Sequence, residues 1–300
     1  MSESRVYTHC VVQNEADVIG PCLDTAAEFS ERIWVWDMGS TDSTWEVLES
    51  RRSDTIQVSR RENLSNLTVK DIRVQMLDEL RPEIPEGSWL YRLDADEFII
   101  GDPRPLLAAA AREGAELVRG WVLNFRPTHA DIRLMDELGQ AEWERIPLVE
   151  RLRSYRVGSP FWKFLRITPD VRWWVEDERS RVAHVSGRKP REASERFVMR
   201  HYQYRGPSQV ALRLETRRKR GVAAEAEAGV PQREFWYEQT DSFRDHVVPA
   251  HRCRRWEEGE EAPSVTTSDL LRYRARRLRN TLQKLPRNLR RSLVRRVKSR

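Results

Sequence analysis

Hydrophobic and polar residues follow a repeating order through the first 125 positions. Short runs rich in β-branched and aromatic residues, typical of strands, alternate with longer stretches whose apolar residues recur every three or four positions, typical of helices. The predicted strands are 6–12, 32–38, 55–59, 89–93 and 116–125, and the predicted helices are 15–29, 41–50, 67–80 and 105–112. Strands that alternate with helices in this way predict an α/β fold with a doubly wound, mostly parallel sheet.

The rest of the chain has a less regular pattern. The stretch 127–201 is rich in arginine and holds four of the 11 tryptophans, namely Trp143, Trp162, Trp173 and Trp174. Sugar rings stack on such side chains, although each tryptophan taken alone is better explained as core. A basic helix is predicted over 209–220. We therefore predict an α/β domain over 1–205 and a mostly helical extension over 206–300.

The charge changes this picture at the C-terminal end. The chain has 53 Lys or Arg and 47 Asp or Glu, but residues 270–300 hold 13 of the bases and none of the acids. Apolar residues recur there every three or four positions, which predicts a basic amphipathic helix interrupted near Pro286. The members of this apolar stripe are Leu278, Leu282, Leu285, Leu289, Leu293 and Val297.

Such a helix is suited to an anionic membrane surface. Packing on the catalytic domain and binding of nucleic acid are alternatives, although no aromatic platform for bases accompanies the charge. No apolar run reaches the roughly 18 residues of a membrane-spanning helix, and no secretory signal is expected at the N-terminus. The cysteines Cys10, Cys22 and Cys253 have no metal-type spacing. We expect a cytoplasmic protein, peripheral on the inner face of the membrane.

Two carboxylates give the strongest chemical signal. Asp94 and Asp96 directly follow the predicted strand 89–93, and ligands of such sheets bind at the carboxyl ends of the strands. Buried carboxylates need a partner, and a Mg²⁺ or Mn²⁺ ion bridging to phosphate oxygens supplies one. An acidic turn that caps a helix is the alternative.

Two further segments make a metal and nucleotide site the better interpretation. Asn14 and Glu15 follow the first strand, and the sequence D-M-G-S-T-D from Asp37 to Asp42 follows the second. Together with the later D-A-D-E-F, these segments resemble family 2 glycosyltransferases, in the same order and with suitable spacing over residues 5–125. The resemblance implies a GT-A-like fold and a nucleotide-diphosphate-sugar donor, with a UDP-sugar favoured.

The resemblance also implies roles for individual residues. Asp37 would contact the nucleobase, and the turn at Asn14 and Glu15 would shape the nucleoside pocket. Asp94 would lie near the ribose and the metal, and Asp96 would bind the metal directly.

A third segment runs from His201 to Gln209. It resembles an H-Y-x-Y-R-S-x-x-Q segment of similar bacterial transferases, with Gly206 in place of the usual Ser. His201 would then be a third metal ligand, with His184 as a rival, and Arg205 would clamp the diphosphate. A packed histidine is the alternative interpretation.

An inverting transferase also needs a base to deprotonate the acceptor hydroxyl. Asp177 resembles the acidic residue that serves family 2 in this way, and Asp131 is another candidate. Glu97 is placed with the catalytic residues, where it would orient the acceptor or a neighbouring arginine. Lys163 is predicted to be a surface lysine, with a contact to phosphate as the alternative.

The sequence therefore predicts a metal-dependent, inverting transfer of a sugar to an acceptor hydroxyl. The acceptor would be a lipid-linked glycan, an envelope polymer, a protein or a small molecule. A nucleotidyltransferase is disfavoured because no Gly-rich phosphate loop is present. A glycosyltransferase of modified DNA and a non-catalytic nucleic-acid- or membrane-binding protein on a transferase scaffold remain alternatives.

Overall fold

The computed structural model describes residues 4–61, 69–175, 181–185, 189–228, 242–257 and 265–284. By its internal contacts the chain divides into two compact units, Met1–Glu260 and Glu261–Arg300. The first unit carries the sheet and the candidate site. It also includes the basic helix after residue 205, which the sequence analysis assigns to the extension.

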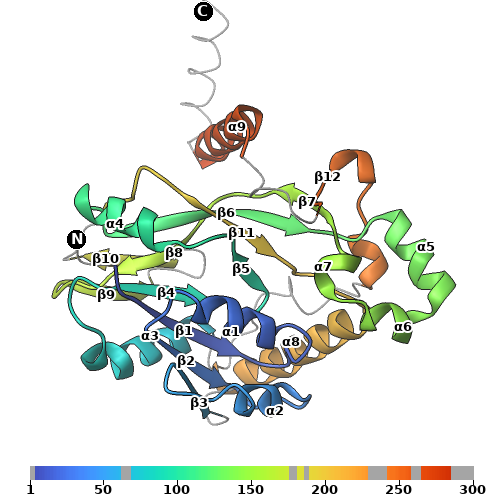
Figure 1. Cartoon of the computed structure of the whole chain (residues 1–300), viewed down its shortest axis with the longest axis horizontal. Helices are drawn as coiled ribbons and strands as arrows, with labels where there is room; N and C mark the ends of the chain where they lie inside the picture. The colour runs from blue at the N-terminus through green and yellow to red at the C-terminus, as the bar shows by residue number, and fades with distance from the viewer. Residues whose placement is uncertain are drawn as a thin grey trace, which may run out of the picture. The chain divides into compact units, whose positions relative to one another are not determined.

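A ten-stranded sheet forms the body of the first unit (Figure 1). Its main path runs β12-β7-β6-β8-β4-β1-β2-β3, and β11 joins β5 to β6. The strands are β1 (Val6–Val12), β2 (Arg32–Asp37), β3 (Ile56–Arg60), β4 (Trp89–Leu93), β5 (Glu97–Ile99), β6 (Leu117–Phe125), β7 (Ser154–Val157), β8 (Phe161–Arg166), β11 (Phe197–His201) and β12 (Arg254–Arg255); β9 (Val171–Val175) and β10 (Arg181–Val185) form a separate hairpin.

Helices are placed along both halves of the chain. They are α1 (Ile19–Ala27), α2 (Thr44–Glu49), α3 (Val69–Leu80), α4 (Arg104–Arg112), α5 (His129–Leu138), α6 (Gln140–Arg145), α7 (Leu148–Arg151), α8 (Pro207–Ala228) and α9 (Thr267–Lys284), with short 3-10 turns η2 (Arg81–Glu83), η4 (Phe243–His246) and η5 (Ala250–Arg252). The predicted α/β class with a mostly parallel sheet is confirmed, because β1, β2, β3 and β4 are parallel neighbours.

The predicted elements of the first 125 residues are present, with two shortened helices. The helix expected from 15 begins at Ile19, after a turn over 16–18. Asn14, just before this turn, has a φ of 58°, a left-handed conformation that asparagine tolerates. The helix expected from 41 begins at Thr44, after a turn in which Gly39 has a φ of 80°. Both shortened starts free backbone for loops at the carboxyl ends of β1 and β2.

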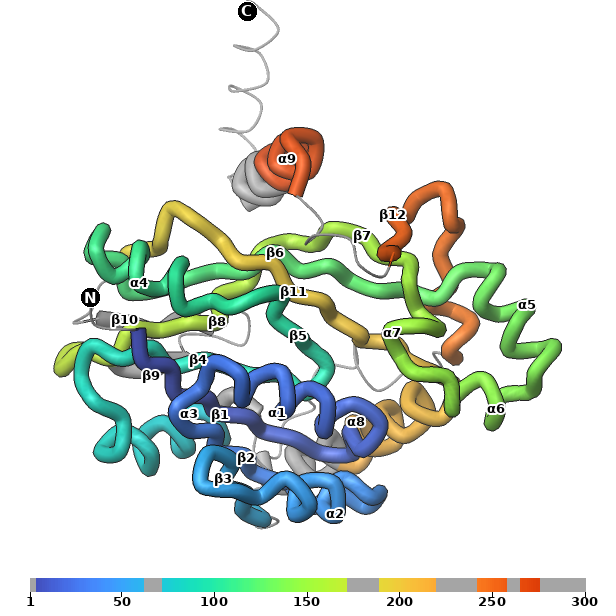
Figure 2. Tube along the Cα trace, in the orientation of Figure 1, coloured from blue at the N-terminus to red at the C-terminus, as the bar shows by residue number. Residues whose placement is uncertain are grey.

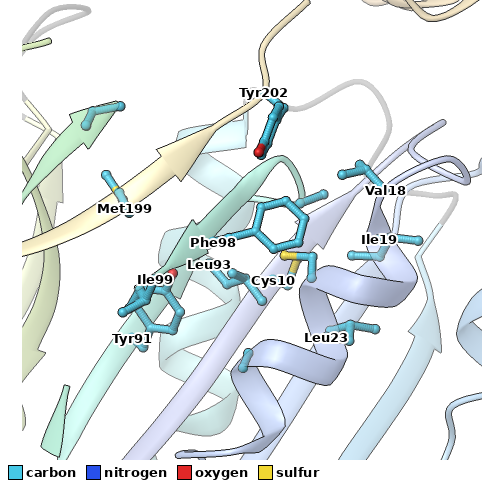
Figure 3. Close-up of a cluster of buried hydrophobic side chains, with 14 of the residues drawn as sticks. Cys10, Val18, Ile19, Leu23, Tyr91, Leu93, Phe98, Ile99, Met199 and Tyr202 are labelled. Atoms are coloured by element: carbon cyan, nitrogen blue, oxygen red, sulfur yellow. The ribbon is translucent and has the colours of Figure 1, made fainter. Parts of the chain in front are cut away.

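Alternating side chains divide the core between the two faces of the sheet. On β2, Ile33 and Val35 face one cluster, while Trp34 and Trp36 face the other. The first cluster includes the apolar stripe of α1, and the second includes that of α3. Figure 3 shows part of the first cluster, in which Leu23 of α1 lies with side chains from β1, β4, β5 and the β11 region.

Strand β11 lies close to the end of β4, because it pairs with β5 and β6. β5 follows two residues after Ala95 and pairs with β11, so that His201 lies opposite Glu97. β11 also runs parallel to β6, where His201 lies opposite Asn124 (Figure 2). This pairing carries a residue that is distant in sequence to the D-A-D turn.

The second unit contains the helix α9. It carries six Lys or Arg and one acidic residue, Asp269. Leu271 is 59% exposed. Within the described residues, no helix is long and apolar enough to cross a membrane. The rest of the predicted basic helix, including Pro286, lies outside the described residues.

Candidate functional site

A cavity of about 390 Å³ opens at the carboxyl ends of β1 and β4. This is the edge of a parallel sheet where ligands bind, and the volume lies within the range of small-molecule sites. Its polar and charged lining comes from the loop after β1, from α3, β4, the D-A-D turn, β11 and α8. The residues are Gln13, Asn14, Glu15, Arg73, Arg92, Asp94, Asp96, Glu97, His201, Gln203, Arg213, Thr216 and Arg217.

Asp94 is half-buried and lies next to three buried charged residues, Arg73, Lys163 and Glu97. Its Oδ1 accepts from Arg73 of α3, and its Oδ2 accepts from the Nζ of Lys163 on β8 at 2.5 Å. Lys163 is fully buried and also contacts Glu97. Burial alone would raise the pKa of Asp94, but Arg73 and Lys163 outweigh it and hold the pKa well below its usual value. Lys163 is therefore an internal counter-ion and not the predicted surface lysine.

Asp96 is held more loosely and through one oxygen. Its Oδ2 lies 3.2 Å from Arg213, 3.5 Å from the Nε2 of His201 and 3.8 Å from Arg205. Burial favours the neutral acid, yet His201, Arg213 and Arg205 hold the pKa of Asp96 well below its usual value. Asp96 is thus ionised at neutral pH, at the wall of the cavity.

His201 has the orientation of a metal ligand. Its Nδ1 lies 2.9 Å from the amide oxygen of Asn124, so Nδ1 donates this bond and Nε2 faces Asp96. A second partner of this kind is typical of ligating histidines, because it fixes the ring and its tautomer. Gly158 leaves the room for Asn124, since a Cβ at this position would come within 2.3 Å of the Asn124 Nδ2.

The donor set fits a divalent cation that also binds a ligand. Two atoms bound to one ion at about 2.1 Å lie roughly 3–4 Å apart, as Asp96 Oδ2 and His201 Nε2 do at 3.5 Å. No group of three or more acidic, His or Cys side chains that could hold a metal occurs among the described residues. Two protein ligands suit a cation that completes its shell with phosphate oxygens and water.

The loop after β1 is joined to the loop after β2. The Oδ1 of Asn14 accepts from the backbone of Thr41 at 2.7 Å, and the backbone of Glu15 donates to Thr44 at 2.8 Å. Asp37 is fully buried and accepts from the backbone of Ser40 at 3.2 Å. It does not line the cavity, and its contact with a nucleobase stays a prediction.

Arg205 is also fully buried. It pairs with Glu15 and Asp17, at 2.7 Å to the latter, and it donates to the carbonyl of Tyr202 at 3.1 Å. Like Asp37, it does not line the cavity. In this position Arg205 joins the loop after β1 to the segment after β11, and its predicted contact with a diphosphate stays a prediction.

The remaining candidates lie elsewhere. Asp177 and the side chain of His184 fall outside the described residues. Asp131 accepts from the backbone and hydroxyl of Thr128 in the capping box of α5, which explains why an acid stands there.

Trp143 and Trp162 are core residues, as the simpler interpretation predicted. The side chains of Trp173 and Trp174 fall outside the described residues. Sequence reasoning missed Arg73, Asn124, Arg213 and Arg217, because none of them lies in a motif.

Comparison with known proteins gives likenesses to solved structures alone; no protein-family model and no curated protein matches the chain. Mannosyl-3-phosphoglycerate synthase from Rubrobacter xylanophilus is 18% identical over 45% of this chain and 48% of that chain, with a TM-score of 0.30. Glucosyl-3-phosphoglycerate synthase from Mycobacterium tuberculosis, in complex with Mn²⁺, uridine diphosphate and phosphoglyceric acid, is 19% identical over 48% and 52%, with a TM-score of 0.27. A mycobacterial protein is 16% identical over 76% of both chains, with a TM-score of 0.34.

The chain spans about half the length of each synthase. At identities of 18% and 19% and TM-scores near 0.3, these likenesses carry no argument about activity. We therefore infer the function from the residues of the site.

Proposed function

We propose that this protein is a metal-dependent glycosyltransferase. It would move a sugar, with inversion, from a nucleotide-diphosphate-sugar to an acceptor hydroxyl, and a UDP-sugar is the favoured donor. The acceptor classes remain a lipid-linked glycan, an envelope polymer, a protein and a small molecule.

One observation carries the proposal. Asp96 and the Asn124-oriented His201 offer two ligand atoms 3.5 Å apart, on a cavity at the carboxyl ends of parallel strands. Two such ligands leave coordination positions for a substrate diphosphate. When bound, Mn²⁺ or Mg²⁺ would offset the negative charge that develops on the departing nucleoside diphosphate.

The chain's own residues would do the remaining work. Asn14 and Glu15 would shape the nucleoside end of the cavity, and Asp94 would present a fixed carboxylate near the ribose. The acceptor hydroxyl would lose its proton to the carboxylate of Asp177. Glu97, which contacts the buried Lys163, would orient the acceptor or a neighbouring arginine.

The proposal is tested by the melting temperature of the protein with nucleoside diphosphates, with and without Mn²⁺. A nucleotide at a hundredfold excess over its Kd stabilises the folded state by about 2.7 kcal/mol. We expect UDP with Mn²⁺ to give such a shift, and Asp96→Asn and His201→Gln to remove its Mn²⁺-dependent part. Turnover is then measured as release of UDP from a panel of UDP-sugars.

Matched controls are Asp102→Asn and His251→Gln, which change exposed residues away from the cavity. These variants should keep the full Mn²⁺-dependent shift. If no nucleoside diphosphate stabilises the wild-type protein with any divalent cation, the proposed function is wrong. If Asp96→Asn and Asp102→Asn show the same Mn²⁺-dependent shift in melting temperature, Asp96 is not a metal ligand.

The basic helix suggests where the reaction takes place. We propose that α9 binds an anionic membrane surface and that the protein is cytoplasmic, because six basic residues and the exposed Leu271 share one helix. A larger fraction of the protein should sediment with phosphatidylglycerol vesicles than with phosphatidylcholine vesicles. The substitution Leu271→Glu should reduce the fraction bound to phosphatidylglycerol. Tighter binding to duplex DNA than to the anionic vesicles would favour the nucleic-acid alternative.

A further inference from the structure

Helix α8 presents two arginines to the cavity. Arg213 and Arg217 are one helical turn apart and both line it, together with Thr216. Neither residue belongs to the segments that carry the family resemblance. Arg205, the arginine that those segments assign to the diphosphate, lies outside the lining and is engaged with Glu15 and Asp17.

The two arginines repel each other, and an anion bound between them would reduce this repulsion. Like charges at positions i and i+4 of a helix destabilise it. Burial and the charge of Arg213 lower the pKa of Arg217. The charges of Asp96 and Glu15 act on Arg217 in the opposite direction, and Asp96 is shared with His201, Arg205 and Arg213.

The surrounding contacts hold α8 in place against the cavity. Arg213 donates to the carbonyl of Gln203, lies 3.2 Å from Asp96 and stacks over the ring of Tyr204 at 5.8 Å. Since a guanidinium has five N–H donors, it can keep these contacts and still donate to a phosphate. The hydroxyl of Thr216 accepts from Asn14 at 2.9 Å, which joins α8 to the loop after β1.

The geometry points to Arg213 and Arg217 of α8 as the binding site for the diphosphate of the donor. The inference rests on the proposed function, and it names the residues that recognise the leaving group. The position of Arg213 beside Asp96 places its guanidinium next to the proposed metal ligands. Arg217 adds a second fork of donors one turn further along the helix. Arg205 then has a positioning role, in which it holds Glu15 and the segment after β11.

The test measures binding in EDTA, so that no metal contributes. Calorimetric titrations of the full chain use UDP, UMP and inorganic pyrophosphate as probes. We expect Arg217→Met and Arg213→Met each to weaken UDP and pyrophosphate at least about tenfold, since a hydrogen bond to a charged group contributes about 1.5–3 kcal/mol. UMP should be affected less, so the preference for UDP over UMP should shrink.

Arg218→Met is the matched control, because Arg218 is the adjacent, exposed arginine of the same helix and does not line the cavity. It should bind UDP and pyrophosphate as the wild type does.

Equal losses in Arg217→Met and Arg218→Met would overturn the inference, because they would indicate a general effect of charge. The inference would also be overturned if the wild-type protein bound neither UDP nor pyrophosphate in EDTA. Mn²⁺-dependent binding of UDP that is unchanged in both cavity variants would leave the proposed function standing and reject this site. Pyrophosphate binding by the wild type that Arg217→Met weakens, without any effect of Mn²⁺ on UDP, would keep the anion site and reject the transferase.

Discussion

Asp94 and Asp96 are two residues apart in sequence, yet they lie in different electrostatic environments. Each oxygen of Asp94 holds its own cation, Arg73 on Oδ1 and Lys163 on Oδ2. For Asp96, the cation contacts within the described residues all reach Oδ2, at 3.2–3.8 Å. A metal at Asp94 would have to displace a close ion pair, whereas a metal at Asp96 would replace looser contacts.

This difference indicates that the two aspartates of the D-x-D motif have different roles. Asp94 and Glu97 are balanced by Arg73 and Lys163, so this group of four charges needs no ligand. Asp96 is instead shared by His201, Arg205 and Arg213 at longer distances, and Asn124 orients the histidine. We infer that Asp94 is a carboxylate fixed by its ion pairs and that Asp96 is the aspartate that binds the metal.

The largest expected effect comes from breaking the balanced cluster. Lys163→Met removes a fully buried cation and leaves Asp94 and Glu97 facing each other without it. Loss of one partner of a buried ion pair typically costs about 3–5 kcal/mol. Denaturant unfolding should show a loss of this size.

Arg213→Met is the contrasting variant in the other cluster. Asp96 keeps His201 and Arg205, so the free energy of unfolding should fall by much less. Equal losses in Lys163→Met and Arg213→Met would contradict the distinction between the two clusters.

A smaller effect, on Mn²⁺ affinity, is expected from changing the residues that orient His201. Asn124→Ala removes the acceptor of the Nδ1 bond, and changes of this kind typically weaken metal binding about 10–100-fold. Gly158→Ala should act in the same direction, because its new methyl group would collide with the Asn124 amide. Competition with a fluorescent chelator would measure the Mn²⁺ affinity.

Gly20→Ala is the control for the glycine variant. Its new methyl group would also meet the far end of a flexible side chain, that of Arg51, but away from the cavity. It should leave Mn²⁺ binding unchanged. If Gly158→Ala and Asn124→Ala bind Mn²⁺ as tightly as the wild type, His201 is not a ligand.

The sequence was informative where local pattern and position along the chain decide the structure. The strands Val6–Val12 and Trp89–Leu93 have the predicted bounds, because both segments are rich in β-branched, aromatic and aliphatic residues. Their carboxyl ends lie on one edge of the sheet, so the neighbourhood of Asn14 and Asp94 followed from topology.

The family resemblance predicted His201 as a third metal ligand, and in the structure it reaches Asp96 through the pairing of β11 with β5 and β6. The other partners could not be predicted, because they depend on long-range pairing. Nothing in a lone asparagine such as Asn124, or in one arginine among the 53 basic residues of the chain, identifies it as part of a site. A lysine between aromatic residues was predicted to lie at the surface. Lys163 is buried instead, because it forms ion pairs with the carboxylates of Asp94 and Glu97.

The smallest expected effect tests whether α8 belongs to the site. Thr216→Val keeps the shape of the side chain but removes the hydroxyl that accepts from Asn14. Such a bond contributes about 1 kcal/mol, so the affinity for UDP should fall about fivefold at most, as the loop after β1 loses one tie to α8. Thr25→Val, on the exposed side of α1, removes a hydroxyl that bonds only to its own helix and should change nothing in a UDP titration. Identical affinities in the two variants would show that Arg213 and Arg217 are held without this contact, and that the other bonds of the loop, such as those of Asn14 to Thr41 and Ser40, are sufficient to position it.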